Sequence, residues 1–284
     1  MKSLGIILIC LATALAARAD TIAEDNPILR PVTASYTLRA GSSHLRDTYL
    51  TPLAYSGWTV GIDYERFQAM KHDPEHWIMR LQASVCGGAT QNPSRTSTMW
   101  DIEFSPSWAM MYRWRPLSEM TMAVGGIVRA NLGALYLSHN SNNPASAKAA
   151  ITVGATAMAT YTFTVGRLPV TLRYQPSLSL IGAFFAPEYD QLYYEIYLGN
   201  RGGVCRMASP VNYRDLENLL TADLRLGNTN LRVGYRNRVF STKASDIVSR
   251  RIEHAFVIGI TTEWISLSAG SRRTPDARLI SSFY

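Results

Sequence analysis

Two long stretches of the chain alternate apolar and polar residues with a period of two, and this alternation restricts the possible folds more than any other feature. The apolar positions are Trp100, Ile102, Phe104, Trp108, Met110, Tyr112 and Trp114 in the first stretch, and Met120, Met122, Val124, Gly126, Val128 and Ala130 in the second. Successive side chains of a β-strand point to opposite faces, so the pattern predicts strands with one apolar face and one mixed polar face.

The length of these strands indicates a membrane. Strands of soluble proteins are usually about 5–6 residues long, and a strand that crosses a bilayer needs about 9–11 residues. Because both stretches exceed even the second length, we expect the apolar face to contact lipid and the polar face to line the inside of a barrel.

The first nineteen residues have the pattern of a secretory signal peptide. Lys2 supplies positive charge, residues 4–16 are apolar, and Ala17-Arg18-Ala19 is an A-x-A cleavage site. No other stretch approaches the roughly 20 apolar residues that a spanning helix needs. We therefore predict a signal peptide over residues 1–19 and a single barrel domain over residues 20–284.

The remaining strands follow from the same alternation. Ten are predicted, at residues 32–40, 57–69, 76–87, 98–114, 119–137, 149–165, 168–182, 219–226, 230–240 and 252–264. Their connections alternate between short ones and long ones, and the longest covers residues 183–218. Short periplasmic turns and long external loops alternate in this way in outer-membrane barrels. The sequence thus predicts an all-β, antiparallel transmembrane barrel of about ten strands, with eight or twelve as alternatives, in the outer membrane of a Gram-negative bacterium and in contact with its lipid.

Aromatic residues on the apolar face lie near the strand ends. Trp77, Trp114 and Trp264 fall at the short-turn ends, and Trp58, Trp100 and Tyr136 fall at the long-loop ends. Aromatic girdles at both membrane interfaces are typical of such barrels. The general preference of aromatic residues for strands explains this sorting less well.

The polar face carries many charged residues, and these are the candidate functional residues. They are Asp63, Glu65, Arg80, Gln82, Asp101, Glu103, Arg113, Arg129, Asn131, Arg173, Gln175, Asp223, Arg225, Arg232 and Arg236. Folding about the short turns places Glu65 opposite Arg80 and brings Glu103 beside Arg129 and Asn131. Buried charges must be paired, so we expect a structural charge network of Asp63, Glu65, Arg80, Asp101, Glu103 and Arg129 that fills a narrow lumen. A small polar or anion-selective pore is the alternative.

Patterns for catalysis and for cofactors are weak. His72 and His76 share a turn with Asp73 and Glu75, but their spacing suits a metal site on a helix rather than in a hairpin. The chain has no glycine-rich phosphate loop, and its basic residues lack the clustering that nucleic acid requires. We expect no cofactor, no metal and no enzymatic activity. The sequence predicts a narrow transport or binding barrel with a charge-filled lumen and the loop at residues 183–218 at its mouth. It leaves open a barrel enzyme acting on lipid or peptide at the external rim through His139 and Ser141, and a purely structural surface protein.

Two cysteines follow the signal peptide. Cys86 lies near the loop end of its predicted strand, and Cys205 lies in the longest loop. An even number of cysteines in an exported protein permits a disulfide. A bridge between Cys86 and Cys205 is therefore possible.

Two short segments carry a resemblance. Residues 47–53, with Tyr55 and Gly57, and residues 235–242 resemble the signature segments of an uncharacterised outer-membrane β-barrel family of Bacteroidota. The resemblance implies an outer-membrane barrel and transfers no catalytic or binding residue. The basic tail at residues 271–284 ends in Phe283-Tyr284, and a terminal aromatic is typical of the signal that the barrel-assembly machinery binds during biogenesis. Because the last predicted strand ends near Trp264, either the tail is periplasmic or the strand count is wrong.

Overall fold

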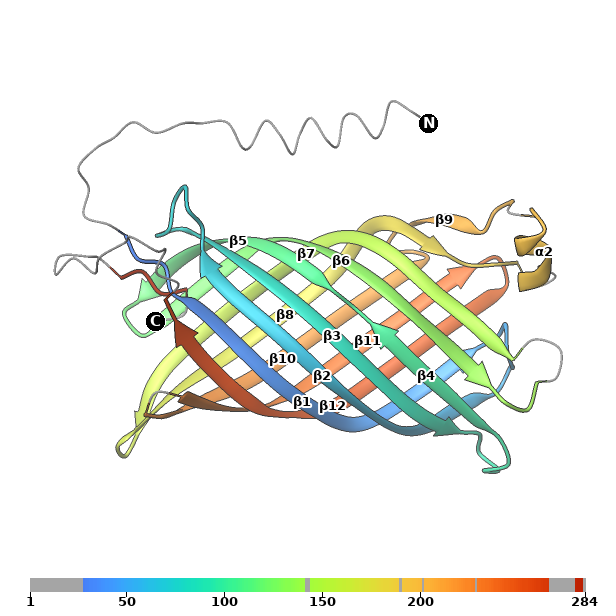
Figure 1. Ribbon diagram of the computed structural model, residues 1–284, viewed down its shortest axis with the longest axis horizontal. Coiled ribbons are helices and arrows are strands. Elements are labelled where there is room, and N and C mark those ends of the chain that lie inside the picture. The colour runs from blue at the N-terminus through green and yellow to red at the C-terminus, as the bar shows by residue number, and fades with distance from the viewer. Residues whose placement is uncertain are drawn as a thin grey trace.

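A single antiparallel sheet winds around an axis and closes on itself (Figure 1). The computed structural model describes residues 28–140, 144–188, 191–200, 202–227, 229–265 and 279–282. The strands are β1 (Val32–Asp47), β2 (Ala54–Ala69), β3 (Trp77–Gln91), β4 (Thr98–Phe104), β5 (Ser107–Leu117), β6 (Met120–Leu137), β7 (Ala145–Val165), β8 (Leu168–Phe185), β9 (Cys205–Ala208), β10 (Tyr213–Leu226), β11 (Thr229–Ala244) and β12 (Ile247–Trp264), and the helix is α2 (Tyr193–Tyr197). The predicted signal peptide at residues 1–19 lies outside the described residues.

The closed barrel has ten strand positions, as predicted. β4 and β5 share one position, because both pair with β3 on one side and with β6 on the other. Pro106 separates them, since proline has no backbone N–H to donate to the sheet. β9 is an extra strand that pairs only with the end of β8. The circle closes where β12 pairs with β1, with Val32 opposite Trp264.

The barrel has two different ends. Short hairpins join β2 to β3, β5 to β6, β7 to β8 and β10 to β11 at what we call the short-turn end, where β1 begins and β12 ends. The opposite, long-loop end carries α2 and β9 (Figure 1). Among the described residues, no helix is long and apolar enough to cross a membrane.

The outer wall is apolar and the interior is polar, which confirms the predicted facing. Ile62, Ile102 and Val124 are half-exposed or more on the outside, at 61%, 61% and 50%. An apolar surface that runs around the whole barrel is suited to lipid and not to water. Trp58 and Trp100 are about half exposed at one end of this wall, and Trp264 is similarly exposed at the other. The fold is therefore a transmembrane barrel.

Several strands extend further at the long-loop end than the alternation predicted. β1 continues to Asp47 and β10 starts at Tyr213, while the predicted long loop at residues 241–251 is a tight turn between Ala244 and Ile247. The longest predicted loop, residues 183–218, contains the short helix α2. Outside the membrane both faces of a strand meet polar surroundings, so the hydrophobic period that marks a strand disappears there.

Candidate functional site

A buried network of ionised side chains fills the middle of the barrel. We call it the lumen network. It consists of eight arginines, Arg39, Arg80, Arg129, Arg173, Arg232, Arg236, Arg238 and Arg251, and eight carboxylates, Asp63, Glu65, Asp101, Glu103, Asp215, Glu217, Asp223 and Glu253. All are buried except Glu103, whose side chain is 13% exposed. The opposite charges are equal in number, so the network is neutral.

Glu65 on β2 organises the part of the network nearer the short-turn end. Its Oε1 accepts a hydrogen bond from Arg80 Nε at 2.7 Å. Its Oε2 accepts from Nη1 of Arg173 at 2.8 Å and from Nη1 of Arg232 at 2.9 Å. Arg232 also donates two bonds to Asp223, at 2.6 and 2.7 Å. One carboxylate thus joins arginines from β3, β8 and β11 across the width of the lumen.

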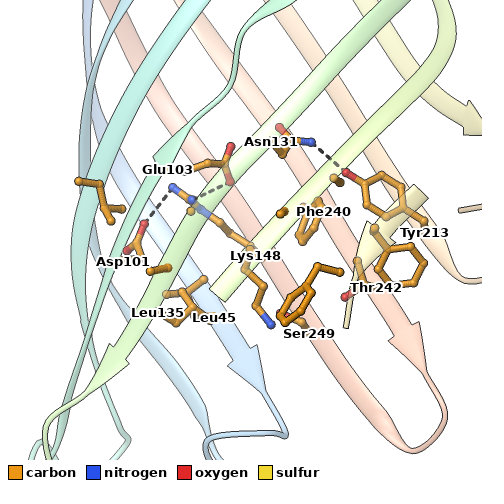
Figure 2. Close-up of a pocket in the computed structure, with 18 residues that line it drawn as sticks. Leu45, Asp101, Glu103, Asn131, Leu135, Lys148, Tyr213, Phe240, Thr242 and Ser249 are labelled. Carbon is orange, nitrogen blue, oxygen red and sulfur yellow. Dashed lines mark hydrogen bonds and ion pairs between the residues drawn. The ribbon is translucent and has the colours of Figure 1, made fainter. Parts of the chain in front are cut away.

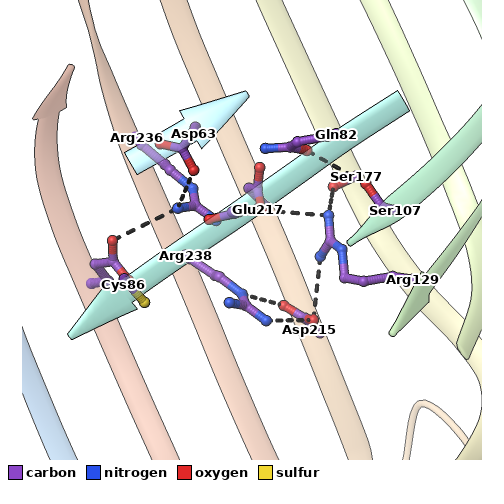
Figure 3. Close-up of polar contacts among 12 residues, drawn as sticks. Asp63, Gln82, Cys86, Ser107, Arg129, Ser177, Asp215, Glu217, Arg236 and Arg238 are labelled. Atoms are coloured by element: carbon purple, nitrogen blue, oxygen red, sulfur yellow. Dashed lines mark hydrogen bonds and ion pairs between the residues drawn. The ribbon is translucent and has the colours of Figure 1, made fainter. Parts of the chain in front are cut away.

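Asp215 and Arg238 form the central pair (Figure 3). Nε and Nη2 of Arg238 donate to the two oxygens of Asp215 at 2.8 and 2.9 Å, which is the bidentate geometry of a strong arginine–carboxylate pair. Arg129 on β6 lies 3.2 Å from Asp215 and 3.4 Å from Glu217. Arg236 donates to Glu217 at 2.9 Å.

The third part of the network surrounds Arg251 on β12. Its guanidinium lies 3.2 Å from Asp101, 3.4 Å from Glu103 and 3.2 Å from Glu253. It also donates to Cys86 Sγ at 3.2 Å. Neither oxygen of Asp101 accepts a hydrogen bond from any described residue, despite the nearby charge of Arg251.

Two predicted pairings need correction. Glu65 and Arg80 do form an ion pair, but Glu65 lies opposite Gln82, and Arg80 is its diagonal neighbour. Glu103 is not beside Arg129, because its cross-strand partner is Gly133. Its charge is instead paired with Arg238 and Arg251, which reach it from the other side of the barrel.

Other predicted lumen residues are placed as follows. Asp63 pairs with Arg39, and Asp101 lies beside Arg251. Arg225 is exposed at the short-turn end and takes no part in the network. The bridge that the sequence permits between Cys86 and Cys205 is not formed: both thiols are free, with Cys86 buried against Arg251 and Cys205 exposed where β9 begins.

Six members of the network were not predicted from the sequence, namely Arg39, Asp215, Glu217, Arg238, Arg251 and Glu253. Asp215 and Glu217 fell in the segment predicted as the longest loop, and Arg251 in another predicted loop. Arg39 and Arg238 were detectable, because each shares the phase of inward residues on its own strand, Thr37 and Arg236. Ala255, the next inward-facing residue after Glu253 on β12, is apolar, so the alternation gave no sign that Glu253 lies on a polar face.

Apolar side chains close the lumen above and below the network. Phe67, Ile78, Met111, Ala123 and Met158 form a buried cluster on the short-turn side. Leu45, Leu50, Tyr55, Met99, Leu135 and Leu137 form another on the long-loop side. A cavity within the network, between Glu65 and Arg236, has a volume of about 20 Å³. Such a space holds about one water molecule.

The described part of the C-terminal tail lies at the short-turn opening. Nη1 of the buried Arg113 donates to the carbonyl of Ser281 at 2.6 Å, and its other nitrogens donate to the Pro74 and Glu75 carbonyls. Ser282 is buried against Thr33, with 3.2 Å between their hydroxyls. The last strand ends at Trp264 as predicted, and the described tail residues 279–282 belong to none of the strands β1 to β12.

A small amphipathic pocket lies at the long-loop end, above the network (Figure 2). Asp101, Glu103 and Arg251 form its charged floor, and Phe184, Phe185, Tyr213 and Phe240 form an aromatic wall. Its cavity measures about 40 Å³. Lys148 also lines the pocket and is paired with the buried Asp47.

Hydrogen bonds join the loops beside this pocket, and we call these loops the lid because Leu50 packs with the pocket residues Leu45 and Leu135, and Tyr193 stacks on Phe185. The amide of Asn140 donates to the Leu50 carbonyl at 2.7 Å, and the hydroxyl of Tyr49 donates to the Gln191 carbonyl at 3.0 Å. The hydroxyl of Tyr193 accepts from the backbone of Ala147 at 2.6 Å. Desolvation at this contact raises the pKa of Tyr193 above its ordinary value, so the lid residue stays neutral at physiological pH.

The histidines that the sequence singled out do not form a catalytic or metal site within the described residues. His139 is exposed in the turn after β6, and Ser141 lies outside the described part of the chain. His76 pairs with Asp73 at 3.1 Å and stacks on Tyr112. No group of three or more potential metal ligands is found in the part of the chain that the structure describes.

Known structures with a similar arrangement are distant in sequence. The transport unit of the autotransporter AIDA-I from Escherichia coli is 8% identical with a TM-score of 0.42, over 92% of this chain and 97% of that one. The outer membrane protease OmpT from Escherichia coli is 7% identical with a TM-score of 0.45, over 87% and 99%. The COG4313 outer membrane channel from Pseudomonas putida F1 is 9% identical with a TM-score of 0.32, over 86% and 100%. No curated protein matches the sequence.

The sequence also matches one protein family. The match covers residues 4–271, and therefore every strand of the barrel. The family is described as "Protein of unknown function (DUF3316)". Because the match extends over nearly the whole chain, the protein belongs to this family.

Proposed function

We propose that this protein is an outer-membrane barrel that binds a small molecule at its long-loop end and does not conduct solutes through its lumen. The continuous apolar wall supports a membrane location, and the signal-peptide pattern supports export. The alternation of short turns and long loops favours an external position for the long-loop end. The resemblance of residues 47–57 suggests a source in the Bacteroidota.

The neutral, paired lumen network is the observation that carries this proposal. A water-filled pore exposes its charged side chains, whereas the arginines of this lumen are at most 7% exposed. Ten strands enclose little more space than eight, and an eight-stranded interior is just filled by side chains. Apolar clusters on both sides of the network add to the closure.

The pocket beneath the lid supports binding. Its floor contains the buried carboxylate of Asp101, which accepts no hydrogen bond from the described residues although Arg251 lies 3.2 Å away. Buried polar groups are normally hydrogen-bonded, so a ligand that brings a donor would satisfy Asp101. The aromatic wall would contact an apolar part of the same ligand. A small zwitterion with a ring fits this chemistry, and the lid must open to admit it because the closed cavity is so small.

Conductance in planar bilayers tests the closed lumen. The mature protein should insert and give no steady channel current, while a general porin in the same bilayer serves as the control for insertion. A stable, ion-selective conductance of the wild-type barrel would contradict the proposal and favour the narrow transport pore.

Thermal shift tests the pocket, with L-phenylalanine as the probe. A ligand that binds only the folded state raises the melting temperature with concentration. The rise should be present in the wild type and absent in Thr242→Phe, which fills the pocket. Thr262→Phe, on the outer wall, is the matched control and should behave like the wild type. Equal responses of all three proteins would exclude this pocket as the binding site.

A further inference from the structure

A group of exposed cations lies on the outer wall near the long-loop end. We call Arg46, Arg214, Lys243 and Arg250 the outer cation cluster. They stand on β1, β10, β11 and β12, which are neighbours in the barrel, and all four are exposed. Their strand phase is opposite to that of the lumen network, so they point away from the interior.

The pairing within this cluster is unfavourable for the protein alone. Arg46 lies directly opposite Arg250, and the same cross-strand row continues through Ser241 to Arg214. Like charges directly opposite each other destabilise a sheet. Arg214 donates to the Pro210 carbonyl at 2.9 Å, but no described carboxylate forms an ion pair with any of the four cations. Every arginine of the lumen network, by contrast, has a carboxylate partner.

The cluster lies at the edge of the apolar wall. Along β12 the outward residues are Ile260, Ile258, Phe256, His254 and Ile252, and then Arg250. Arg250 is therefore the first cation beyond the lipid-facing stretch of its strand. Lipid head groups occupy this depth of the bilayer.

An apolar groove lies on the outer wall over β12, β1, β2, β3 and β4, so it shares β1 and β12 with the cluster. Its volume is about 780 Å³, and its lining includes Leu38, Ala40, Trp58, Val60, Ile62, Val85, Trp100, Ile102, Phe256 and Ile258. Small side chains at Ala40 and Gly87 leave the groove open between bulky neighbours. Ala40 and Arg46 are six residues apart on β1, or about 20 Å along an extended strand. Ser42 and His44 occupy the polar stretch between them.

We propose that the outer cation cluster and this groove together bind a phosphorylated glycolipid of the outer leaflet. The phosphates lie on the cations, where arginine forms bidentate, charge-assisted hydrogen bonds. An acyl chain lies in the groove, and the sugar spans the polar residues between the two. A lipid is favoured over free phosphate because an apolar groove lies on two of the same strands, β1 and β12, on the membrane side of the cations. This site rests on the external orientation of the long-loop end, and it is separate from the pocket under the lid.

Lipid retained during purification tests the site. The barrel is extracted from its own outer membrane in a mild detergent, and the bound phosphoglycolipid is quantified by mass spectrometry of its 3-hydroxyacyl chains. The double variant Arg46→Gln with Arg250→Gln should retain at least about tenfold less than the wild type, since the loss of even one charge-assisted bond is worth about a factor of ten. Ala40→Phe, which fills the groove, should also retain less. Arg167→Gln with Arg225→Gln removes two exposed arginines at the other end and should retain the wild-type amount.

Thermal stability provides the second measurement. Without lipid, the Arg46→Gln and Arg250→Gln double variant should melt at or above the wild-type temperature, because the like-charge contact is gone. Added phosphoglycolipid should raise the melting temperature of the wild type and leave that of the variant unchanged. Equal retention and equal shifts in both proteins would overturn the proposal. The proposal would also be overturned if inorganic phosphate alone raised the melting temperature of the wild type as much as the phosphoglycolipid does, or if the protein retained a glycerophospholipid in place of the glycolipid. None of these variants touches the pocket, so the proposed binding function is tested independently.

Discussion

At the scale of single residues, Glu65 contributes more to the interior than its position in the sequence suggests. Its two oxygens hold Arg80, Arg173 and Arg232, so one carboxylate compensates positive charge from three strands. Removing one partner of a buried ion pair costs more than the pair contributes, because the remaining charge stays desolvated. This loss of stability is greatest where one carboxylate is paired with several arginines.

We expect Glu65→Gln to lower the free energy of unfolding by about 3–5 kcal/mol. Denaturant titration of the mature barrel in detergent measures this loss. Asp73→Asn is the matched control, since its carboxylate lies in an exposed turn, and it should change stability by no more than about 0.5 kcal/mol. Adding Arg80→Ala to Glu65→Gln should not restore stability, because Arg173 and Arg232 stay uncompensated. Full recovery in the double variant would show that Glu65 acts through one pair only.

At the scale of elements, the short-turn opening is shaped by a contact between β5 and the tail. The guanidinium of Arg113 donates hydrogen bonds both to carbonyls of the hairpin between β2 and β3 and to the carbonyl of Ser281. The guanidinium is always charged and presents its donors in a fixed fork. This contact fixes the tail across the opening without any strand pairing between them.

Arg113→Gln should therefore release the tail from the opening. A cysteine introduced at Ser282, which is fully buried in the wild type, should react with a maleimide at least about tenfold faster in this variant. The factor of ten corresponds to the loss of about 1.4 kcal/mol of contacts. Arg225→Gln, at the same end but outside the contact, is the control. Unchanged labelling in Arg113→Gln would mean that other contacts hold the tail.

The loops at the two ends should differ in accessibility on intact cells. A tag inserted at Gly202, in the long connection between β8 and β10, should be bound by antibody without permeabilisation. A tag at Gly227, in the short turn between β10 and β11, should be bound only after the outer membrane is opened. The opposite labelling would invert the proposed orientation and move the outer cation cluster to the periplasmic leaflet.

At the scale of the whole molecule, the barrel reverses the arrangement of a soluble protein. Its charges lie inside in a neutral network, and its largest apolar side chains lie outside against lipid. Lipid cannot hydrogen-bond to the backbone, so the sheet must close to satisfy every strand edge. The closure of β12 on β1 achieves this without an exposed edge.

Arginine substitutions on the outer wall test this arrangement. Ile102→Arg or Val124→Arg should cost about 2–4 kcal/mol, as for a basic residue near the middle of the membrane on the lipid face of a barrel. The heat-modifiable, folded band on unheated gels should decrease accordingly. Val165→Arg, at the end of β7 on the same outer face and 60% exposed, is the control and should cost about 0–1 kcal/mol. Normal assembly of Ile102→Arg and Val124→Arg would show that these residues do not face lipid.

The sequence by itself determined the class of fold, the ten strand positions and the face to which Glu65, Arg80 and Ile102 point. These properties depend on a period of two, which is local and survives wherever a strand has lipid on one side. The pairing of Glu103 with Arg238 and Arg251 was decided only by the tertiary structure, because those side chains meet across the barrel and not across neighbouring strands. The extent of β1, β10 and β11 outside the membrane was also decided only by the tertiary structure, since their residues there have polar surroundings on both faces. Local pattern thus fixes which way a residue faces, and only closure of the barrel determines which charge it meets.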